Sequence, residues 1–149
     1  MLLTGTFSRA IDEKLRIAIP KPFRDRLAKS PPGVLYVAPG TDGSLAIYPE
    51  ETFSQLAERL AKVSPTAHDV RAFGRLFFAQ AQAVEVDGQG RIRIPPELAQ
   101  LAALDKEAVL IGVQDHLELW DRRRWEVYLT EKQPRYDEIA ENAFGRPES

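Results

Sequence analysis

Alternating apolar and polar side chains predict that much of this chain is built from short β-strands. At residues 16–19 the alternation places two isoleucines on one face, which is typical of a half-buried strand. From residue 49 to 63 the apolar residues instead recur three or four positions apart, which predicts an amphipathic helix. Applied along the chain, the two periods predict strands at 6–11, 16–19, 34–38, 44–48, 81–86, 91–94, 108–113 and 116–120. They predict helices at 20–28, 49–63, 67–78, 96–101 and 121–136, followed by a frayed tail at 141–149.

The order of these elements occurs twice. Residues 12–20 return 75 positions later as residues 87–95, with five of the nine positions identical. The strands at 34–37 and 45–48 also recur, at offsets of 75 and 72. A duplicated β unit whose hairpin loop changed length explains this pattern. Each copy alone would bury too little surface, so we expect the two copies to share one core.

This organisation indicates an α+β fold with two tandem β-hairpin domains and flanking helices. We expect a first domain at 3–50, a helical linker at 51–79, a second domain at 80–123, and a C-terminal helix and tail at 124–149. In each domain the strand before the repeated turn is expected to pair with the strand after it.

Composition narrows the class of protein. The 149 residues include no cysteine, and no apolar run approaches the roughly 18 residues of a membrane span. The start of the chain lacks the basic and long apolar segments of a signal peptide. We therefore expect a cytoplasmic protein that does not associate with a membrane.

The distribution of charge matters more than its total. The net charge is −2, which is unfavourable for a nucleic-acid binder. However, residues 1–75 carry 11 basic against 8 acidic side chains, whereas residues 76–149 carry 9 against 14. A basic patch in the first half would still attract phosphate locally, although salt would screen it readily.

Each copy places an aspartate four residues before an arginine, across a turn. Asp12 and Asp87 are expected to accept backbone N–H groups and so organise the turns. Arg16 and Arg91 open the strands that follow, and an arginine fork suits phosphate or the O6/N7 edge of guanine. The candidate site also includes Gly88 and Gly90, which are expected to give the second turn positive φ. Lys14 lies at the tip of the first turn, and Arg9 is expected across the hairpin from the return strand. Arg93 is expected on the same face as Arg16 and Arg91.

A purely structural explanation competes with this one. Turns of this kind are common in hairpins, and a local Asp–Arg salt bridge contributes under ~1 kcal/mol. The two copies stand in matched contexts, each followed by Ile-x-Ile-Pro. That duplication favours a functional role over a local salt bridge.

Other side chains are better explained by structure than by chemistry. The arginines at 122–124 are expected to form a solvated helix face or a contact between subunits, because acidic residues flank them. A core or subunit-interface position is expected for Phe73, Phe77 and Phe78, and a core position for Trp120 and Trp125.

The sequence does not predict an enzyme. There is no glycine-rich phosphate loop, and adjacent glutamates at 50–51 on a helix point in different directions. The two histidines, His68 and His116, have no nucleophilic cysteine to act with. We expect no cofactor and no metal; a metal-dependent hydrolase around His116, Asp115 and Glu118 is a remote alternative.

Two Asp-x-x-x-Arg turns, each followed by Ile-x-Ile-Pro and a short helix, resemble the MraZ family. The segments at 45–49 and 117–121, Leu-x-Ile-Tyr-Pro and Leu-x-Leu-Trp-Asp, fit the same pattern, as does the segment at 74–78. The similarity covers about residues 3–130. It implies two tandem domains of the SpoVT/AbrB type, forming a pseudo-symmetric double-psi or swapped-hairpin barrel.

The resemblance also implies a function. Proteins of this family are cytoplasmic, nucleoid-associated transcriptional regulators that form ring-shaped homo-oligomers. They bind short repeated sequences in double-stranded DNA upstream of the division and cell-wall gene cluster that includes their own gene. By position, Arg16 and Arg91 become the principal DNA-contacting residues, with Asp12 and Asp87 as their turn-organising partners.

One position departs from the family pattern. Leu15 stands where the family usually has glycine, as Gly90 does in the second copy. Leucine at positive φ costs roughly 1 kcal/mol or more, so a wider first turn is expected. An alternative from another class remains open: a protein-interaction scaffold of AbrB-like fold, whose arginines grip an acidic partner protein instead of DNA.

Overall fold

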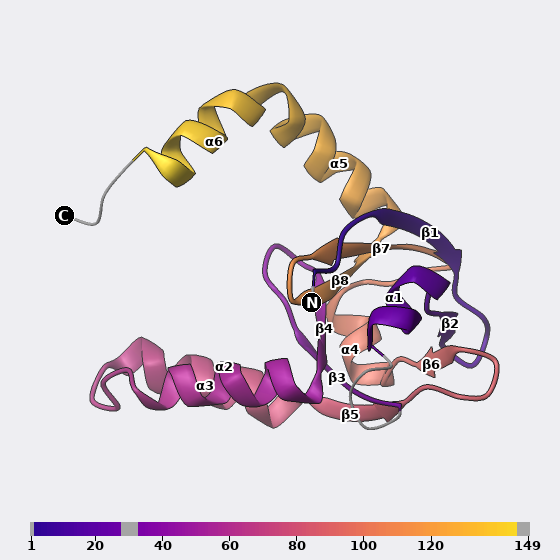
Figure 1. The fold of residues 1–149 in the computed structure, drawn as a ribbon, viewed down its shortest axis with the longest axis horizontal. Coiled ribbons are helices and arrows are strands. Elements are labelled where there is room, and N and C mark those ends of the chain that lie inside the picture. The colour runs from indigo at the N-terminus through magenta and orange to yellow at the C-terminus, as the bar shows by residue number, and fades with distance from the viewer. Residues whose placement is uncertain (1, 28–32, 146–149) are drawn as a thin grey trace.

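The computed structural model describes residues 2–27 and 33–145 and contains strands and helices in alternating groups (Figure 1). The strands are β1 (Thr6–Ala10), β2 (Arg16–Ala18), β3 (Val34–Pro39), β4 (Leu45–Pro49), β5 (Gln82–Glu85), β6 (Arg91–Arg93), β7 (Glu107–Val113) and β8 (His116–Asp121). The helices are α1 (Lys21–Leu27), α2 (Glu50–Ala61), α3 (His68–Gln80), α4 (Pro96–Leu101), α5 (Arg122–Lys132), the 3-10 turn η1 (Gln133–Arg135) and α6 (Tyr136–Phe144). The α+β class expected from the sequence is confirmed, with every sheet contact antiparallel.

The two copies exchange strands. One sheet has six strands in the order β1-β7-β8-β4-β3-β5, and the other has two, β2 and β6. The expectation that β1 and β2 pair as a hairpin is wrong, because β1 pairs with β7 of the second copy and β2 pairs with β6. In the same way β5 pairs with β3 rather than with β6. Strand exchange lets both copies bury their apolar faces together, which a unit of about 70 residues cannot do well alone.

The core is shared between the copies, as the sequence predicts. Ile17 and Ile19 from the first copy and Ile92 and Ile94 from the second are all at most 2% exposed. They belong to a single cluster that also contains the buried Phe23 and its counterpart Leu98, from α1 and α4. The alternating isoleucines therefore do point inward, and the residues between them point outward.

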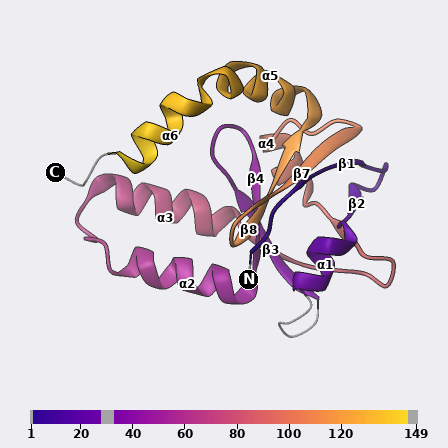
Figure 2. The same ribbon diagram turned by 45° about the horizontal axis from the view of Figure 1, so that its top comes forward.

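Two pairs of helices project away from the β-strands on one side, whereas α1 and α4 pack against the core (Figure 1). Helices α2 and α3 form a hairpin, and α5 with α6 forms a bent arm, while the turns before β2 and β6 lie at the opposite side of the molecule (Figures 1 and 2). Phe77 fixes the hairpin to the sheet, since it is buried and lies 5.8 Å from Phe53 and 6.1 Å from Tyr48, centroid to centroid. Phe73 is 45% exposed and is not a core residue of the chain.

The second aromatic cluster lies at the start of the arm. Trp120 is 3% exposed and packs against Trp125 and Tyr128, with ring centroids 5.2 and 5.0 Å away. Asp121 caps α5 by accepting the backbone N–H of Arg123 at 3.2 Å. This confirms the core position expected for Trp120.

The C-terminal region differs from its prediction. The single helix expected at 121–136 is two helices joined by η1, because Pro134 lacks the N–H that a continuous helix requires. The expectation of a frayed tail is wrong for residues 141–144, which complete α6. The expected fraying of 146–149 and the helix end at residue 28 lie outside the described residues. Within the described ranges, no helix is long and apolar enough to cross a bilayer.

Candidate nucleic-acid interface

The first repeated turn is organised by Asp12. Its Oδ1 accepts the backbone N–H groups of Lys14 at 2.9 Å and of Arg16 at 2.8 Å. Two backbone bonds close the turn, from Leu15 N–H to the Asp12 carbonyl at 3.0 Å and from Asp12 N–H to the Arg16 carbonyl at 3.1 Å. An aspartate is needed because its short side chain reaches both amides at once.

The second turn repeats this geometry. Asp87 Oδ1 accepts the N–H groups of Gln89 at 2.8 Å and Arg91 at 3.0 Å. The Gly90 N–H donates to the Asp87 carbonyl at 3.0 Å, and the Asp87 N–H donates to the Arg91 carbonyl at 2.8 Å. Gly90 has the expected positive φ of 77°, but the same expectation for Gly88 is wrong, since Gly88 does not have a positive φ.

Leu15 adopts the conformation that glycine has in the second turn. Its φ is 61°, and the backbone hydrogen bonds that close the first turn match those around Gly90 to within 0.3 Å. The wider first turn expected from the sequence is therefore wrong. The leucine side chain is half-buried and packs against the shared core, and that burial offsets a backbone strain of roughly 1 kcal/mol.

Each aspartate also holds the arginine that follows it. Asp12 Oδ2 accepts from Arg16 Nε at 2.7 Å, and Asp87 Oδ2 accepts from Arg91 Nε at 3.1 Å. The side chains of Arg16 and Arg91 remain 34% and 29% exposed. Among the described residues, neither arginine donates a hydrogen bond from its two terminal nitrogens. The aspartates thus orient the guanidinium groups while leaving their outer edges available to a ligand.

The hydrogen bonds in the two turns also lower the pKa values of Asp12 and Asp87. The N–H of Arg16 holds the pKa of Asp12 below its ordinary value, with further help from the Arg16 side chain and the Lys14 N–H. The N–H groups of Arg91 and Gln89 and the Arg91 side chain lower the pKa of Asp87 in the same way. Both turns are therefore held by ionised carboxylates at neutral pH.

Strand pairing brings the two arginine turns onto one surface. In the β2–β6 sheet, Arg16 lies directly opposite Arg93, Ile17 opposite Ile92, and Ala18 opposite Arg91. Since the isoleucines are buried, the other face of this sheet carries all three arginines. Arg93 is exposed, and it has no salt bridge within the described part of the chain. Like charges facing one another destabilise a strand pair, so this face is suited to an anion.

The two remaining predicted cations, Lys14 and Arg9, lie outside the β2–β6 pairing. Lys14 is exposed at the tip of the first turn, as expected. Arg9 is not across a hairpin from β2, because it lies in β1 opposite Ala108 of β7. Its guanidinium donates to the Ser8 carbonyl at 2.8 Å and lies 5.6 Å from the centre of the Phe7 ring.

Sequence reasoning missed one arginine at this site. Arg24, on α1, donates from Nε to the carbonyl of Ile19 at 3.0 Å. Its side chain covers the second turn, because a Cβ added to Gly90 would lie 2.9 Å from Arg24 Cδ. The alignment of the two copies contains a signal for it. At the 75-residue offset a large residue stands opposite a small one twice, Arg24 against Ala99 and Leu15 against Gly90.

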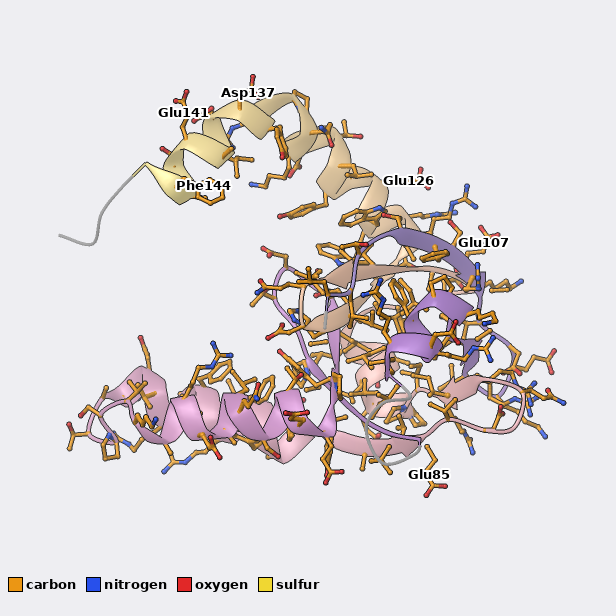
Figure 3. All side chains as sticks on the ribbon, viewed as in Figure 1. Glu85, Glu107, Glu126, Asp137, Glu141 and Phe144 are labelled. Atoms are coloured by element: carbon orange, nitrogen blue, oxygen red, sulfur yellow. The ribbon has the colours of Figure 1, made fainter. Side chains whose placement is uncertain are left out.

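The acidic part of the chain lies elsewhere. Asp137 and Glu141 are carried on the α6 arm, and Glu126 lies near the start of α5, whereas Glu107 lies in β7 opposite Ala10 (Figure 3). Arg122 forms salt bridges with Glu107 and Glu126, which fits the solvated helix face expected for the arginines at 122–124. The acidic side chains of α5 and α6 therefore lie apart from the β2–β6 sheet, whereas Glu85 ends β5, two residues before Asp87, and Glu13 lies in the first turn.

His116 has structural partners. Its Nδ1 lies 2.9 Å from Asp115 Oδ1, its Nε2 lies 3.8 Å from Glu118 Oε2, and its ring stacks on Tyr48 with centroids 5.1 Å apart. Glu118 also accepts from Trp120 Nε1 at 3.0 Å. In the part of the chain that the structure describes, no group of three or more His, Cys, Asp or Glu side chains could hold a metal ion.

The geometry defines a tandem-repeat protein whose two copies interlock and present paired Asp–Arg turns. Comparison with known proteins agrees. The MraZ protein family, which its description likens to antitoxins, matches residues 2–76 and again residues 77–147. The chain is 39% identical to a protein named transcriptional regulator MraZ from Finegoldia magna, over 88% of this chain and 89% of that protein. Proteins of the same name from Heliobacterium modesticaldum and Thermomicrobium roseum are 41% and 43% identical, over 94% and 83% of this chain and 95% and 84% of theirs.

The chain therefore belongs to the MraZ family, with two tandem MraZ repeats, and this family is not one of enzymes.

Proposed function

We propose that this protein is a sequence-specific DNA-binding transcriptional regulator that acts on the division and cell-wall gene cluster containing its own gene. The observation that carries the proposal is the β2–β6 sheet, which gathers Arg16, Arg91 and Arg93 on one solvent-facing surface. The names of the relatives support it, since the three proteins compared above are all named transcriptional regulators.

The turns supply the contacts with DNA. Arg16 and Arg91 are held at Nε by their aspartates, so each offers its outer nitrogens in a fixed direction to guanine or phosphate. Less conformational freedom is lost on binding when a side chain is already oriented. Lys14 and Arg93 supply phosphate contacts beside the turns, and Arg9 adds one from the adjoining strand β1.

We propose that the protein acts as a ring-shaped homo-oligomer. A single chain with a net charge of −2 would bind DNA weakly, but several tethered surfaces bind a repeated operator much more tightly. Exposed apolar side chains on the projecting helices, including Leu76 at 64% and Phe144 at 91%, support contacts between copies. The exchange of strands between repeats supports the swapped-hairpin barrel class, with domains at 3–50 and 80–123. A cytoplasmic, nucleoid-associated location follows from the proposed function.

A footprint on the DNA upstream of the protein's own gene tests the proposal. Wild-type protein should protect short repeated sites, and the Arg16→Ala/Arg91→Ala variant should lose that protection, with a cost of ~1–3 kcal/mol for each base-reading arginine. Arg75→Ala on α3, an exposed arginine remote from the turns, is the matched control and should bind like wild type. Operator binding that survives the double substitution would overturn the proposal and favour the protein-interaction scaffold instead.

A further inference from the structure

The two turns have the same backbone geometry but different neighbours. Over the second turn lies Arg24, whose Cδ and Nη1 both come within 2.9 Å of the place where a Gly90 Cβ would be. At the equivalent places of the first turn, a leucine replaces the glycine and Ala99 replaces the arginine. Helix α1 lies beside the β2–β6 sheet in both ribbon views (Figures 1 and 2).

The pair Arg24 and Gly90 and the equivalent pair Ala99 and Leu15 each combine one large and one small side chain. A side chain at residue 90 would collide with Arg24, so Gly90 leaves room for it. In the other half Ala99 is 6% exposed, and Leu15 packs against the core cluster to which Ala99 belongs. A large and a small residue thus occupy each pair of positions in opposite order, and only the second turn is covered by an arginine from a helix.

The charge of Arg24 is not neutralised. Arg16 and Arg91 each have a carboxylate on Nε, whereas Arg24 Nε donates to the neutral carbonyl of Ile19. No salt bridge to Arg24 is formed by the residues that the structure describes, and its side chain is exposed. Its terminal nitrogens are held beside the arginine turn with a full positive charge, which is suited to a phosphate group.

We propose that Arg24 is a third DNA-contacting arginine, which binds a backbone phosphate next to the site of Arg91. The two turns then bind DNA through different sets of cations: Arg91 and Arg24 at the second turn, and Arg16 with Lys14 and the opposing Arg93 at the first. This inference rests on the proposed function and adds one phosphate contact to it, made by a helix residue beside the second turn.

The Arg24→Met substitution tests the role of the charge, since a methionine side chain would keep an unbranched apolar cover over Gly90. Affinity would be measured by fluorescence anisotropy at several salt concentrations, on an operator duplex from upstream of the gene and on an unrelated duplex of equal length. Arg24→Met should weaken binding to both duplexes by about 5-fold or more and should reduce the slope of log K against log salt by about 0.9 per bound chain. The matched control Arg26→Met, from the same helix, should leave both quantities unchanged.

Two results would overturn the inference. If Arg24→Met binds like wild type, Arg24 only covers the turn. If it weakens operator binding without changing the salt slope, the phosphate contact is wrong. The reciprocal variant Leu15→Gly/Ala99→Arg should steepen the slope by a similar amount, because it gives the first turn the same pair. Failure of the proposed function is distinguishable, because wild-type protein would then fail to bind the operator at all.

Discussion

Ile94 donates its backbone N–H to the carbonyl of Leu15 at 2.8 Å, and Ile19 makes the equivalent bond to Gly90 at 2.9 Å. These bonds extend the β2–β6 pairing beyond its three central residue pairs. Each arginine turn is therefore closed by a strand of the other repeat. The separation between Arg16 and Arg91 is fixed only when both repeats are folded together.

A half-chain should not fold as a monomer. Residues 1–76 would leave β1 without β7 and β2 without β6, and would expose Ile17, Ile19 and Phe23. We expect this fragment to be unfolded or to pair with a second copy of itself. Circular dichroism with size-exclusion chromatography would show this, and a monomeric fragment with a cooperative thermal transition would contradict the shared core.

Leu15 and Ala99 should be energetically coupled. The Ala99→Arg substitution would overfill the space that Leu15 occupies, and should lower the free energy of unfolding by ~1–3 kcal/mol. In a Leu15→Gly background the same substitution should cost much less. A double-mutant cycle by urea denaturation should give a coupling of about 1 kcal/mol or more, whereas additive effects would show that the two side chains do not share one space.

The aspartates should affect DNA binding through the arginines. Asp12→Asn and Asp87→Asn keep an oxygen for the backbone N–H groups but lose the ion pair with Arg16 or Arg91. We expect each to weaken operator binding by about 2- to 10-fold, because a freed guanidinium must be ordered on binding. Melting temperatures should change little. A loss of affinity explained entirely by unfolding would contradict the orienting role.

We expect acid to destabilise both turns, because Asp12 and Asp87 must be ionised to hold them. Their pKa values are lowered in the folded state, so their contribution to stability is present above the unfolded pKa of about 3.9 and is lost as pH falls through the lower folded value. NMR titration of the carboxyl carbons should show both groups protonating below that value. A midpoint above it for either group would show that its turn is not closed in solution.

The contribution of His116 to stability should depend on pH with the opposite sign. The carboxylates of Glu118 and Asp115 raise the pKa of His116 above its ordinary value. Its contribution to stability is therefore full below the unfolded pKa of about 6.5 and is lost as pH rises through the folded pKa. Urea denaturation at pH 5.5 and pH 8 should show that His116→Gln removes this component. If the pH dependence of stability is unchanged in the variant, that dependence comes from other groups.

Local features of the fold could be predicted from the sequence because they depend on neighbouring residues. The period-two pattern located the strands, and the Asp-x-x-x-Arg segments located the turns. The repeat itself indicated a shared core, which the structure confirms. The candidate residues Asp12, Asp87, Arg16 and Arg91 follow from the same local chemistry.

Long-range features could not be predicted in this way. A strand pattern specifies which face is buried but not which strand lies beside it, so the pairing of β1 with β7 was missed. The tolerance of Leu15 at positive φ depends on its packing against a core built by both copies, and the place of Arg24 depends on the missing side chain of Gly90. The sequence by itself determined two Asp–Arg turns. Only the tertiary structure decided that they share one surface and that Arg24 covers the second turn, because burial and packing between distant segments govern both.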